Sequence, residues 1–214
     1  MRLETPFSMK PPVVLQHPLL AQALTRLRDK STPRAEFRRL LLECGRFLAC
    51  EATRSLETRR IRVQTPLATA PGVTLRRPVI LVPVLRAGLS LLDPFREILP
   101  DAAIGFVGQR RNEETLLPET YLFKVPPSKA ADVFVLDPML ATGGSAISTI
   151  QGLKDQGARR IQLVCLLAAP EGIEAVSRAH PDVAITTAAL DRKLNQVGYI
   201  VPGLGDAGDR CFGT

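Results

Sequence analysis

An acidic residue and a run of glycine and hydroxyl residues follow the apolar segment Val133–Leu136. Asp137 comes directly after it, and Ala141-Thr-Gly-Gly-Ser145 then leads into a helical pattern. Two glycines permit a tight turn that brings successive N–H groups toward a ligand, and a helix start adds unpaired donors and a positive dipole end. We therefore expect a cradle for one phosphate, to which Thr142 and Ser145 add hydroxyls. Asp137 is placed to accept hydrogen bonds from the hydroxyls of a sugar.

Two arginines are further candidates for binding an anion. Arg86 follows the apolar segment Val79–Leu85 and precedes a turn with Gly88, and Arg111 lies in the polar stretch 108–127. A guanidinium presents several donors to phosphate oxygens and stays charged. The alternative is that each is an ordinary arginine, capping its own turn or facing solvent.

Length and composition limit the class of protein. The chain has 214 residues, of which 45% are hydrophobic and 23% are charged, as in a globular domain with an aliphatic core. Its apolar runs are too short to span a bilayer. The first ten residues lack the basic and apolar pattern of a signal peptide. These features predict a cytoplasmic protein without a membrane segment.

Cysteine and histidine residues do not form a recognisable metal-binding or redox motif. No C-x-x-C pair is present, and the two histidines stand alone in the sequence. We expect reduced structural thiols and no transition-metal site. The residues concerned are Cys44, Cys50, Cys165, Cys211, His17 and His180.

The net charge of +7 is concentrated near the N-terminus. Residues 22–62 contain eleven Lys or Arg and five Asp or Glu, which leaves +6 in that segment. Such a balance suggests anionic partners, and RNA is one of them. A solvated, arginine-rich helical face is the simpler interpretation.

The remaining pattern alternates strands and helices. A helix is expected at 17–30, with Pro18 in its first turn. A longer helix follows, with Thr32 as its cap and Pro33 as its first residue. Further helices are expected at 89–98, 145–156 and 171–179. Strands are expected at 61–67, 79–85, 103–107, 132–136, 161–167 and 183–187, with a turn at Pro71–Gly72. This order predicts a parallel α/β sheet with helices on both faces. Ligands then bind beyond the carboxyl ends of the strands.

The loop Asp137–Ser145 resembles the ribose-phosphate loop of the type I phosphoribosyltransferases. It lacks the Gly-Lys-Ser/Thr of a Walker A loop and the G-x-G-x-x-G of dinucleotide-binding folds. Its sequence D-P-M-L-A-T-G-G-S is similar to that of the uracil phosphoribosyltransferase family, and the likeness extends from about residue 16 to the C-terminus. Further motifs that agree, in order, are His17-Pro-Leu-Leu20, Glu51-Ala-Thr53, Val82-Pro-Val-Leu-Arg-Ala-Gly88, Arg111-Asn-Glu-Glu-Thr115, Ala168-Ala-Pro-Glu-Gly172, Ala179-His-Pro-Asp182 and Gly198-Tyr-Ile-Val-Pro-Gly-Leu-Gly-Asp-Ala-Gly-Asp-Arg210.

The sequence departs from the family pattern at two positions. Type I enzymes usually carry two adjacent acids in the loop, whereas this chain has Asp137-Pro138. The family usually has an aromatic residue before the flap arginine, whereas this chain has Arg110. The first departure puts direct metal contact by Asp137 in question, and the second puts the packing of the flap in question.

The resemblance implies a fold and an organisation. The fold is α/β, type I phosphoribosyltransferase-like, with a central parallel sheet flanked by helices, a flap hairpin and an N-terminal helical arm. A single phosphoribosyltransferase domain would fill residues 1–214. Within it, residues 1–60 would form the helical arm, 108–127 the flap and 194–214 an irregular, glycine-rich base-binding tail.

The resemblance also assigns site residues. Uracil presents a carbonyl, an N–H and a second carbonyl along one edge, and the backbone of a glycine-rich tail can supply the matching groups. By likeness to the family, uracil is held by Ile200, Gly205, Asp206 and Ala207. The phosphoribosyl diphosphate is held by Arg86, Arg111, Asp137, Pro138, Met139, Leu140, Ala141, Thr142, Gly143, Gly144, Ser145 and Asp206. The catalytic residues are Asp206, Arg111 and Asp137.

The implied reaction joins uracil to 5-phospho-α-D-ribose 1-diphosphate and gives UMP and diphosphate. Mg²⁺ is expected to arrive with the diphosphate substrate rather than in a metal site of the protein. The resemblance also implies a homo-oligomer, a dimer or larger, and raises GTP as an effector. An RNA-binding regulatory protein on the same fold is the alternative hypothesis, although the complete uracil-type tail does not favour it.

Overall fold

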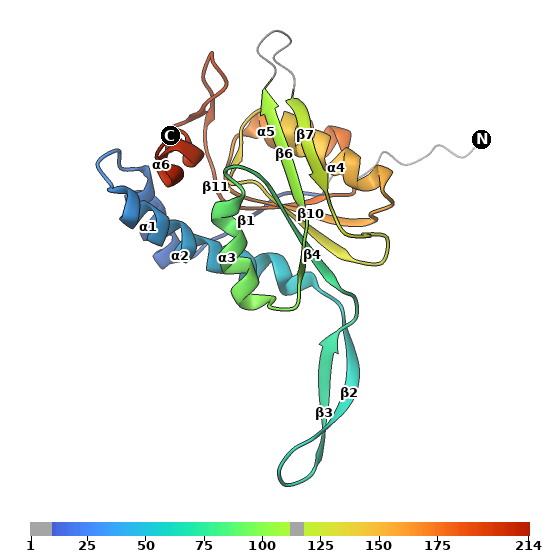
Figure 1. The fold of residues 1–214 in the computed structure, drawn as a ribbon. Coiled ribbons are helices and arrows are strands. Elements are labelled where there is room, and N and C mark those ends of the chain that lie inside the picture. The colour runs from blue at the N-terminus through green and yellow to red at the C-terminus, as the bar shows by residue number, and fades with distance from the viewer. Residues whose placement is uncertain (1–9, 112–117) are drawn as a thin grey trace, which may run out of the picture.

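A computed structural model describes residues 10–111 and 118–214 and contains a nine-stranded sheet (Figure 1). The strand order is β1-β11-β10-β8-β4-β6-β7, with β5 beside β4 and β9 beside β10. All described pairs in this sheet are parallel except the flap pair β6–β7. The strands are β1 (Val13–Val14), β4 (Val79–Leu85), β5 (Ala103–Ile104), β6 (Phe106–Arg111), β7 (Pro118–Lys124), β8 (Asp132–Leu136), β9 (Met139–Leu140), β10 (Arg160–Ala168) and β11 (Ala184–Leu190).

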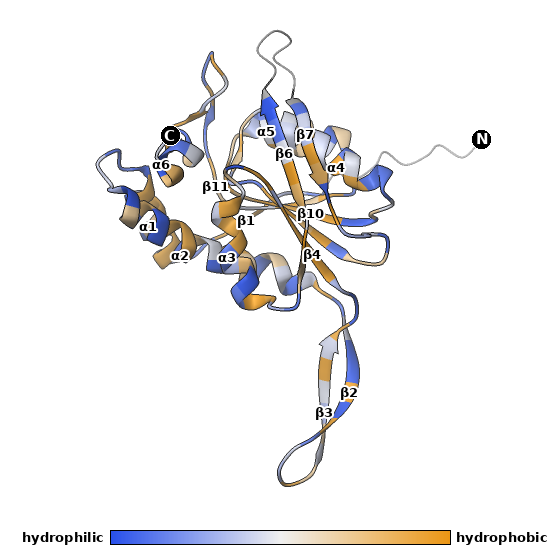
Figure 2. Ribbon diagram, in the orientation of Figure 1, coloured by the Kyte–Doolittle hydropathy of each residue, from blue (hydrophilic) through white to orange (hydrophobic). Residues whose placement is uncertain are grey.

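Helices cover both faces of the sheet, as the sequence predicts. Alternate strand residues point to opposite faces, so Leu81 and Phe134 join one apolar cluster while Ile80 and Val133 join the other. The first face packs against α1 (Pro18–Arg28), α2 (Arg34–Ala52), α3 (Leu89–Ile98) and α6 (Ala207–Phe212). The second packs against α4 (Gly144–Asp155) and α5 (Pro170–Ala179). Figure 2 shows the apolar strands between these helices.

The two N-terminal helices, which the sequence predicts as a helical arm, pack on the core of the molecule. Phe37, Leu40 and Leu48 of α2 are fully buried against the sheet and α3. The expected cap differs. Pro33 occupies the cap position of α2, while the Thr32 hydroxyl donates to the Arg26 carbonyl.

A two-stranded hairpin, β2 (Thr58–Gln64) and β3 (Thr69–Leu75), extends away from the sheet (Figure 1). The strand predicted at 61–67 overlaps β2 over residues 61–64, whereas the turn predicted at Pro71–Gly72 is wrong. Pro71 and Gly72 lie within β3, and the chain reverses at Thr65–Ala68, where the Thr65 hydroxyl and backbone bond to Ala68. A short 3₁₀ helix, Thr53–Ser55, leads from α2 toward the hairpin.

The flap and the tail are more ordered than the sequence indicates. The segment predicted as one strand at 103–107 divides into β5 and β6. Strands β6 and β7 form the predicted flap hairpin, whose residues 112–117 lie outside the described part. The tail, expected to be irregular, contains β12 (Lys193–Leu194), β13 (Ile200–Val201) and α6.

Two of the cysteines are core residues, as predicted. Cys44 and Cys165 are buried, and burial raises the pKa of each thiol to about 12. All four cysteines are free. Over residues 10–111 and 118–214, every helix falls short of the length and apolarity that crossing a membrane requires.

Candidate active site

The predicted phosphate cradle lies at the carboxyl end of β8, where the chain enters α4. Asp137 follows β8, and β9 then pairs with β10, so the loop is held against the sheet. Gly143 precedes α4 with φ of 85°, a left-handed conformation that glycine adopts without strain. The first turn of α4 contains no acidic residue, so its positive dipole end is available to an anion.

Two glycines outside the loop allow the backbone to approach it closely. A Cβ on Gly172 of α5 would lie 2.3 Å from the carbonyl oxygen of Ala141, and a Cβ on Gly88 would lie 2.4 Å from that of Leu136. Any larger residue at either position would displace the loop or the end of β8. The glycines of the motifs Ala168–Gly172 and Val82–Gly88 therefore have a packing role beside the cradle.

Asp137 occupies a desolvated position at the floor of the loop. Burial raises the pKa of this carboxyl to about 6, and a hydrogen bond from the Met139 backbone opposes the rise. A carboxylate with little water around it binds neutral hydroxyl donors well, because it exchanges few hydrogen bonds with solvent. The position suits recognition of sugar hydroxyls.

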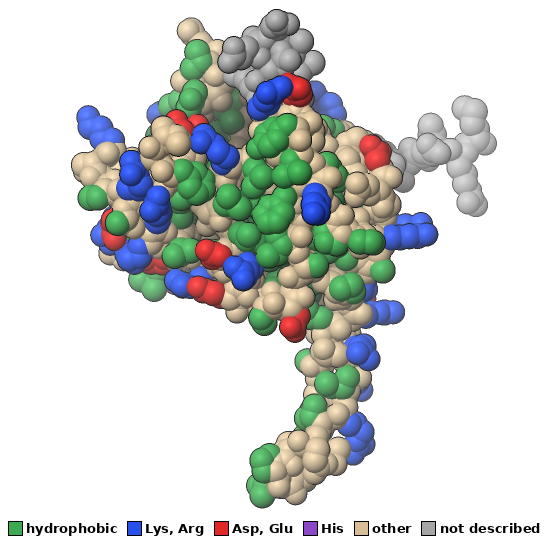
Figure 3. Space-filling model, in the orientation of Figure 1, with side chains coloured by type: hydrophobic (Ala, Val, Ile, Leu, Met, Phe, Trp, Pro, Cys, Tyr) green, Lys and Arg blue, Asp and Glu red, His purple; other side chains and the backbone are tan. Residues whose placement is uncertain are grey.

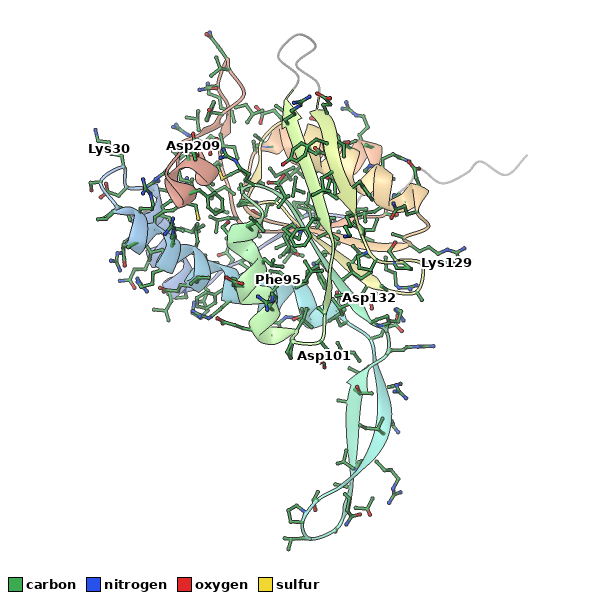
Figure 4. All side chains as sticks on the ribbon, viewed as in Figure 1. Lys30, Phe95, Asp101, Lys129, Asp132 and Asp209 are labelled. Atoms are coloured by element: carbon green, nitrogen blue, oxygen red, sulfur yellow. The ribbon has the colours of Figure 1, made fainter. Side chains whose placement is uncertain are left out.

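Arg86 reaches toward the C-terminal segment from the turn after β4. Its Nη1 donates to the Thr214 hydroxyl at 3.2 Å, and Nη2 lies 3.6 Å from Asp209, which Figure 4 labels on α6. The side chains of Arg86 and Asp209 are 58% and 51% exposed, so this contact contributes little stability and leaves Arg86 able to turn toward a ligand.

The other predicted arginine lies at the flap. Arg111 is the last residue of β6, and its side chain lies outside the described part. Arg110, which replaces the usual aromatic residue, forms an exposed ion pair with Glu119 on β7 at 3.0 Å. At this position the two flap strands are joined by charge on their outer surface.

The tail places its predicted uracil residues around one turn. Ile200 lies in β13, Gly205 has φ of 82°, and Ala207 begins α6. Asp206 caps this helix, because its Oδ1 accepts a hydrogen bond from the Asp209 N–H at 2.8 Å. The positive φ of Gly205 is a left-handed conformation that glycine adopts without strain, and Ala207 is buried at the start of α6.

A cavity lies between the tail and residues Met139 and Ala141 of the cradle loop. Its volume is about 270 Å³, a size that suits a small planar ligand. The wall is formed by Ala87, Met139, Ala141, Val197, Gly198, Tyr199, Ile200, Gly205, Asp206, Ala207 and Gly208. Residues of the loop after β4, the loop after β8 and the tail thus meet at the carboxyl edge of the sheet. Ala87 and Gly208 stand in motifs quoted above but were not predicted as site residues, and Val197 lies outside those motifs.

A second hollow, of about 240 Å³, lies at the opposite edge of the sheet. Asp132, labelled in Figure 4, begins β8 there, and its oxygens lie 3.3 Å from Arg77 and 3.1 Å from Arg160. Its charged lining is therefore largely paired internally, and it contains none of the predicted site residues.

Comparisons with known proteins agree with this arrangement. A model of the uracil phosphoribosyltransferase family matches residues 14–214. The chain is 51% identical to the uracil phosphoribosyltransferase of Dictyoglomus turgidum over 204 residues, which is 94% of this chain and 99% of the relative. It is 52% identical to that of Paracoccus denitrificans over 203 residues, or 94% of this chain and 96% of the relative.

Solved structures show the same fold. A protein from Aquifex aeolicus superposes with a TM-score of 0.90 at 35% identity and covers 94% of this chain and 98% of its own. A hypoxanthine-guanine phosphoribosyltransferase from Bacillus anthracis superposes with a TM-score of 0.51 at 14% identity, over 74% of this chain and 80% of its own. The latter likeness concerns the fold alone.

Proposed function

The chain belongs to the uracil phosphoribosyltransferase family, and from this premise we propose which part of its site binds each substrate. The reaction transfers the phosphoribosyl group of 5-phospho-α-D-ribose 1-diphosphate to uracil and gives UMP and diphosphate. The observation that carries the assignment is the cavity that the cradle and the tail share. The tail and the residues Met139 and Ala141 of the cradle loop face this same open cavity, so a base and a sugar bound there would be neighbours.

The cradle binds the phosphoribosyl group. Thr142, Gly143, Gly144 and Ser145 surround the 5′-phosphate, with N–H groups at the start of α4 and two hydroxyls as donors. Asp137 accepts hydrogen bonds from the ribose hydroxyls. The intervening residues Pro138, Met139, Leu140 and Ala141 form the floor under the sugar, and the pairing of β9 with β10 supports this role.

Arg86 and Arg111 bind the diphosphate. Arg86 exchanges its weak contacts with Thr214 and Asp209 for phosphate oxygens, since a guanidinium binds them with several charged hydrogen bonds. Arg111 comes from the flap, which closes over the site and excludes water.

The tail binds uracil. Ile200, Gly205 and Ala207 present main-chain groups to the two carbonyls and the N–H of the base. Cytosine offers the wrong pattern at one position and leaves a buried group unpaired, which can cost about 10⁴-fold in specificity. Asp206 lies beside both the base and the sugar.

The chemistry is a substitution at the anomeric carbon. Uracil N1 attacks this carbon, the bond to the diphosphate oxygen breaks, and the electron pair leaves with diphosphate. Positive charge develops on the sugar ring, so alignment of the reactants and stabilisation of the leaving group are the dominant effects. The proton of N1 passes toward Asp206.

Mg²⁺ carried by the diphosphate substrate would supply neutralisation of part of the diphosphate charge. Asp206 lines the cavity and Asp137 begins the adjoining loop, and Mg²⁺ commonly binds proteins through one or two carboxylates together with phosphate oxygens and water. This donor set fits an ion carried by the substrate. Whether a single acid in the loop also touches the ion is a question for metal titration of Asp137→Asn.

Contact with a second copy of the chain would explain why the hairpin projects with exposed apolar side chains. Strands β2 and β3 pair only with each other among the described residues, and an isolated hairpin of this kind is marginally stable in water. Leu67 is 96% exposed and Val73 is 65% exposed on it. We therefore assign the hairpin to contact with a second copy. GTP as an effector and the cytoplasm as location stay predictions from the sequence, as does a single domain over residues 1–214.

The RNA-binding alternative rests on the basic segment 22–62. In the structure this charge is divided between α1, α2 and β2, and the face in Figure 3 shows Lys and Arg both over the N-terminal helices and along the hairpin. Several of its arginines are paired with carboxylates, namely Arg26, Arg28, Arg39, Arg46 and Arg54. Salt-dependent RNA binding that persists in phosphate buffer is the result that would favour this alternative.

Diphosphate release by the purified protein tests the proposed function. The assay contains 5-phosphoribosyl 1-diphosphate and Mg²⁺ with uracil, cytosine, hypoxanthine or no base. We expect release with uracil alone, in step with formation of UMP. Folded protein that binds the sugar diphosphate but releases diphosphate with none of the bases would refute the function.

A further inference from the structure

A buried carboxylate lies behind the uracil turn without taking part in the reaction described above. Asp191 follows β11, and its side chain is only 5% exposed. Its two oxygens accept hydrogen bonds from Arg28 of α1 at 2.8 and 2.5 Å. One of them also accepts the Gly203 N–H at 2.8 Å.

Arg28 also contacts Gly203 directly. Its Nη1 donates to the Gly203 carbonyl at 2.8 Å in addition to its bonds with Asp191. The N–H and the C=O of Gly203 are therefore both fixed by one charged pair. The bonds bring together α1, the end of β11 and the tail, which are distant in sequence.

Gly203 is the pivot of the segment that carries the uracil contacts. It has φ of +61°, and a Cβ there would lie 2.2 Å from the carbonyl oxygen of Ile200. The chain thus folds tightly between Ile200 and Gly205, two of the proposed uracil residues. A rotation at this pivot would move the main-chain groups of both residues relative to the cavity.

A second arginine, Arg210, contacts the residue that follows Gly203. Arg210 donates to the Leu204 carbonyl at 2.8 Å and to backbone carbonyls at the end of α1, and its guanidinium lies 4.3 Å from the Phe37 ring centroid. Arg210 therefore links Leu204, next to Gly203, to the end of α1 through hydrogen bonds. Asp191 and Arg28 remain the contacts that fix both the N–H and the C=O of Gly203.

Stability alone does not explain a buried ion pair here. Desolvation of two charges offsets much of their attraction, so well-packed apolar residues often serve equally well. What a bidentate Arg–carboxylate pair supplies is orientation, since its fork fixes two directions at once. Orientation matters most where a ligand is recognised by backbone groups that must already be in position.

We propose that Asp191 and Arg28 are positioning residues for uracil recognition. They clamp the Gly203 peptide and so set the main-chain groups of Ile200 and Gly205 at the base edge. This inference rests on the proposed uracil site. Apart from Asp206, the proposed contacts of the phosphoribosyl group lie outside the tail, mainly between β8 and α4, so we expect the clamp to act mainly on the base and to change binding of the sugar diphosphate little.

The test compares Asp191→Ala and the milder Arg28→Lys with the wild type. Asp132→Asn is the matched control, because Asp132 also pairs with arginine side chains but lies at the opposite edge of the sheet. For each protein we would measure kcat, the KM of uracil, the Kd of 5-phosphoribosyl 1-diphosphate without base, and amide hydrogen exchange over residues 200–208. A thermal melt reports whether each variant is folded.

Asp191→Ala is expected to raise the KM of uracil at least tenfold and to speed exchange at Gly203, with kcat within threefold and the Kd of the sugar diphosphate within twofold. Arg28→Lys should change the same quantities less, and Asp132→Asn should change none. An unchanged KM of uracil, or equal losses for both substrates, would overturn the proposal. Wild-type protein that forms no UMP would refute the proposed function and the role in uracil binding, while exchange at Gly203 would still report the clamp separately.

Discussion

Asp137 is kept in an environment that favours its protonated form, which has a cost for folding. The folded pKa of about 6 lies above the ordinary value of 3.8, so the folded protein holds this proton more tightly than the unfolded chain. The resulting penalty is absent below pH 3.8, grows as the pH rises to about 6, and is then constant. A functional carboxylate is thus retained at the expense of stability.

We expect Asp137→Asn to stabilise the free protein by about 2 kcal/mol at pH 8, allowing for partial solvent screening. The gain should shrink steadily as the pH falls toward 4. The same variant should lose about 10²-fold in kcat/KM for the sugar diphosphate, because hydroxyl acceptors are lost. Urea unfolding at several pH values and steady-state kinetics measure both effects. A loss of stability at pH 8 would contradict the desolvated carboxylate.

Asp206 has two separable roles, and two variants distinguish them. Asn caps a helix as well as Asp does, so Asp206→Asn should melt near the wild-type temperature, whereas Asp206→Ala should lose about 1 kcal/mol of stability. Both should lower kcat at least 100-fold, since each removes the charge beside N1. Steady-state rates and thermal melts provide the comparison. Wild-type turnover by Asp206→Asn would exclude Asp206 from the chemistry.

At the scale of elements, the cradle depends on how closely α5 approaches it. Gly172→Ala places a methyl group 2.3 Å from the Ala141 carbonyl oxygen, so the loop has to shift. We expect kcat/KM for the sugar diphosphate to fall roughly tenfold or more, since small displacements of a binding loop weaken alignment. Gly72→Ala is the matched control, because its nearest contact would be an ordinary 3.6 Å. Equal kinetics for the two variants would show that the loop tolerates the methyl group.

Elements with a strong local signal could be predicted from the sequence. The apolar segment before Asp137, the glycines after it and Gly157 at the helix end define β8 and α4 to within a residue or so. The hairpin β2–β3 could not be read in the same way. Arg59, Arg60 and Arg62 give β2 no buried face, and the turn is formed by a Thr65 side-chain bond rather than by Pro71–Gly72.

Contacts between elements distant in the chain could not be predicted from the sequence. The bond of Arg28 to Asp191 spans 163 positions, and the bond of the Leu194 N–H to Glu171 spans 23. Neither pair has a local pattern, because each partner has an ordinary position in its own helix or strand end. The cradle and the tail residues were predicted individually, but the cavity between them required the fold.

At the scale of the whole molecule, we propose that the projecting hairpin forms the contact between two copies of the chain. The Arg76 N–H donates to the Glu57 carbonyl at 2.8 Å, so the hairpin's ends are adjacent and residues 58–75 can be replaced by a two-residue turn. We expect the shortened protein to sediment as a smaller species than the wild type. Unchanged sedimentation would place the copy-to-copy contact elsewhere on the surface.

The division of the substrates between cradle and tail is tested most directly by a crystal structure of the protein with UMP. We expect the 5′-phosphate at Thr142–Ser145, the ribose hydroxyls at Asp137, and the uracil ring in the 270 Å³ cavity against the backbone of Ile200, Gly205 and Ala207. UMP bound in the hollow beside Arg77 and Asp132, or with its base turned away from the tail, would contradict the account.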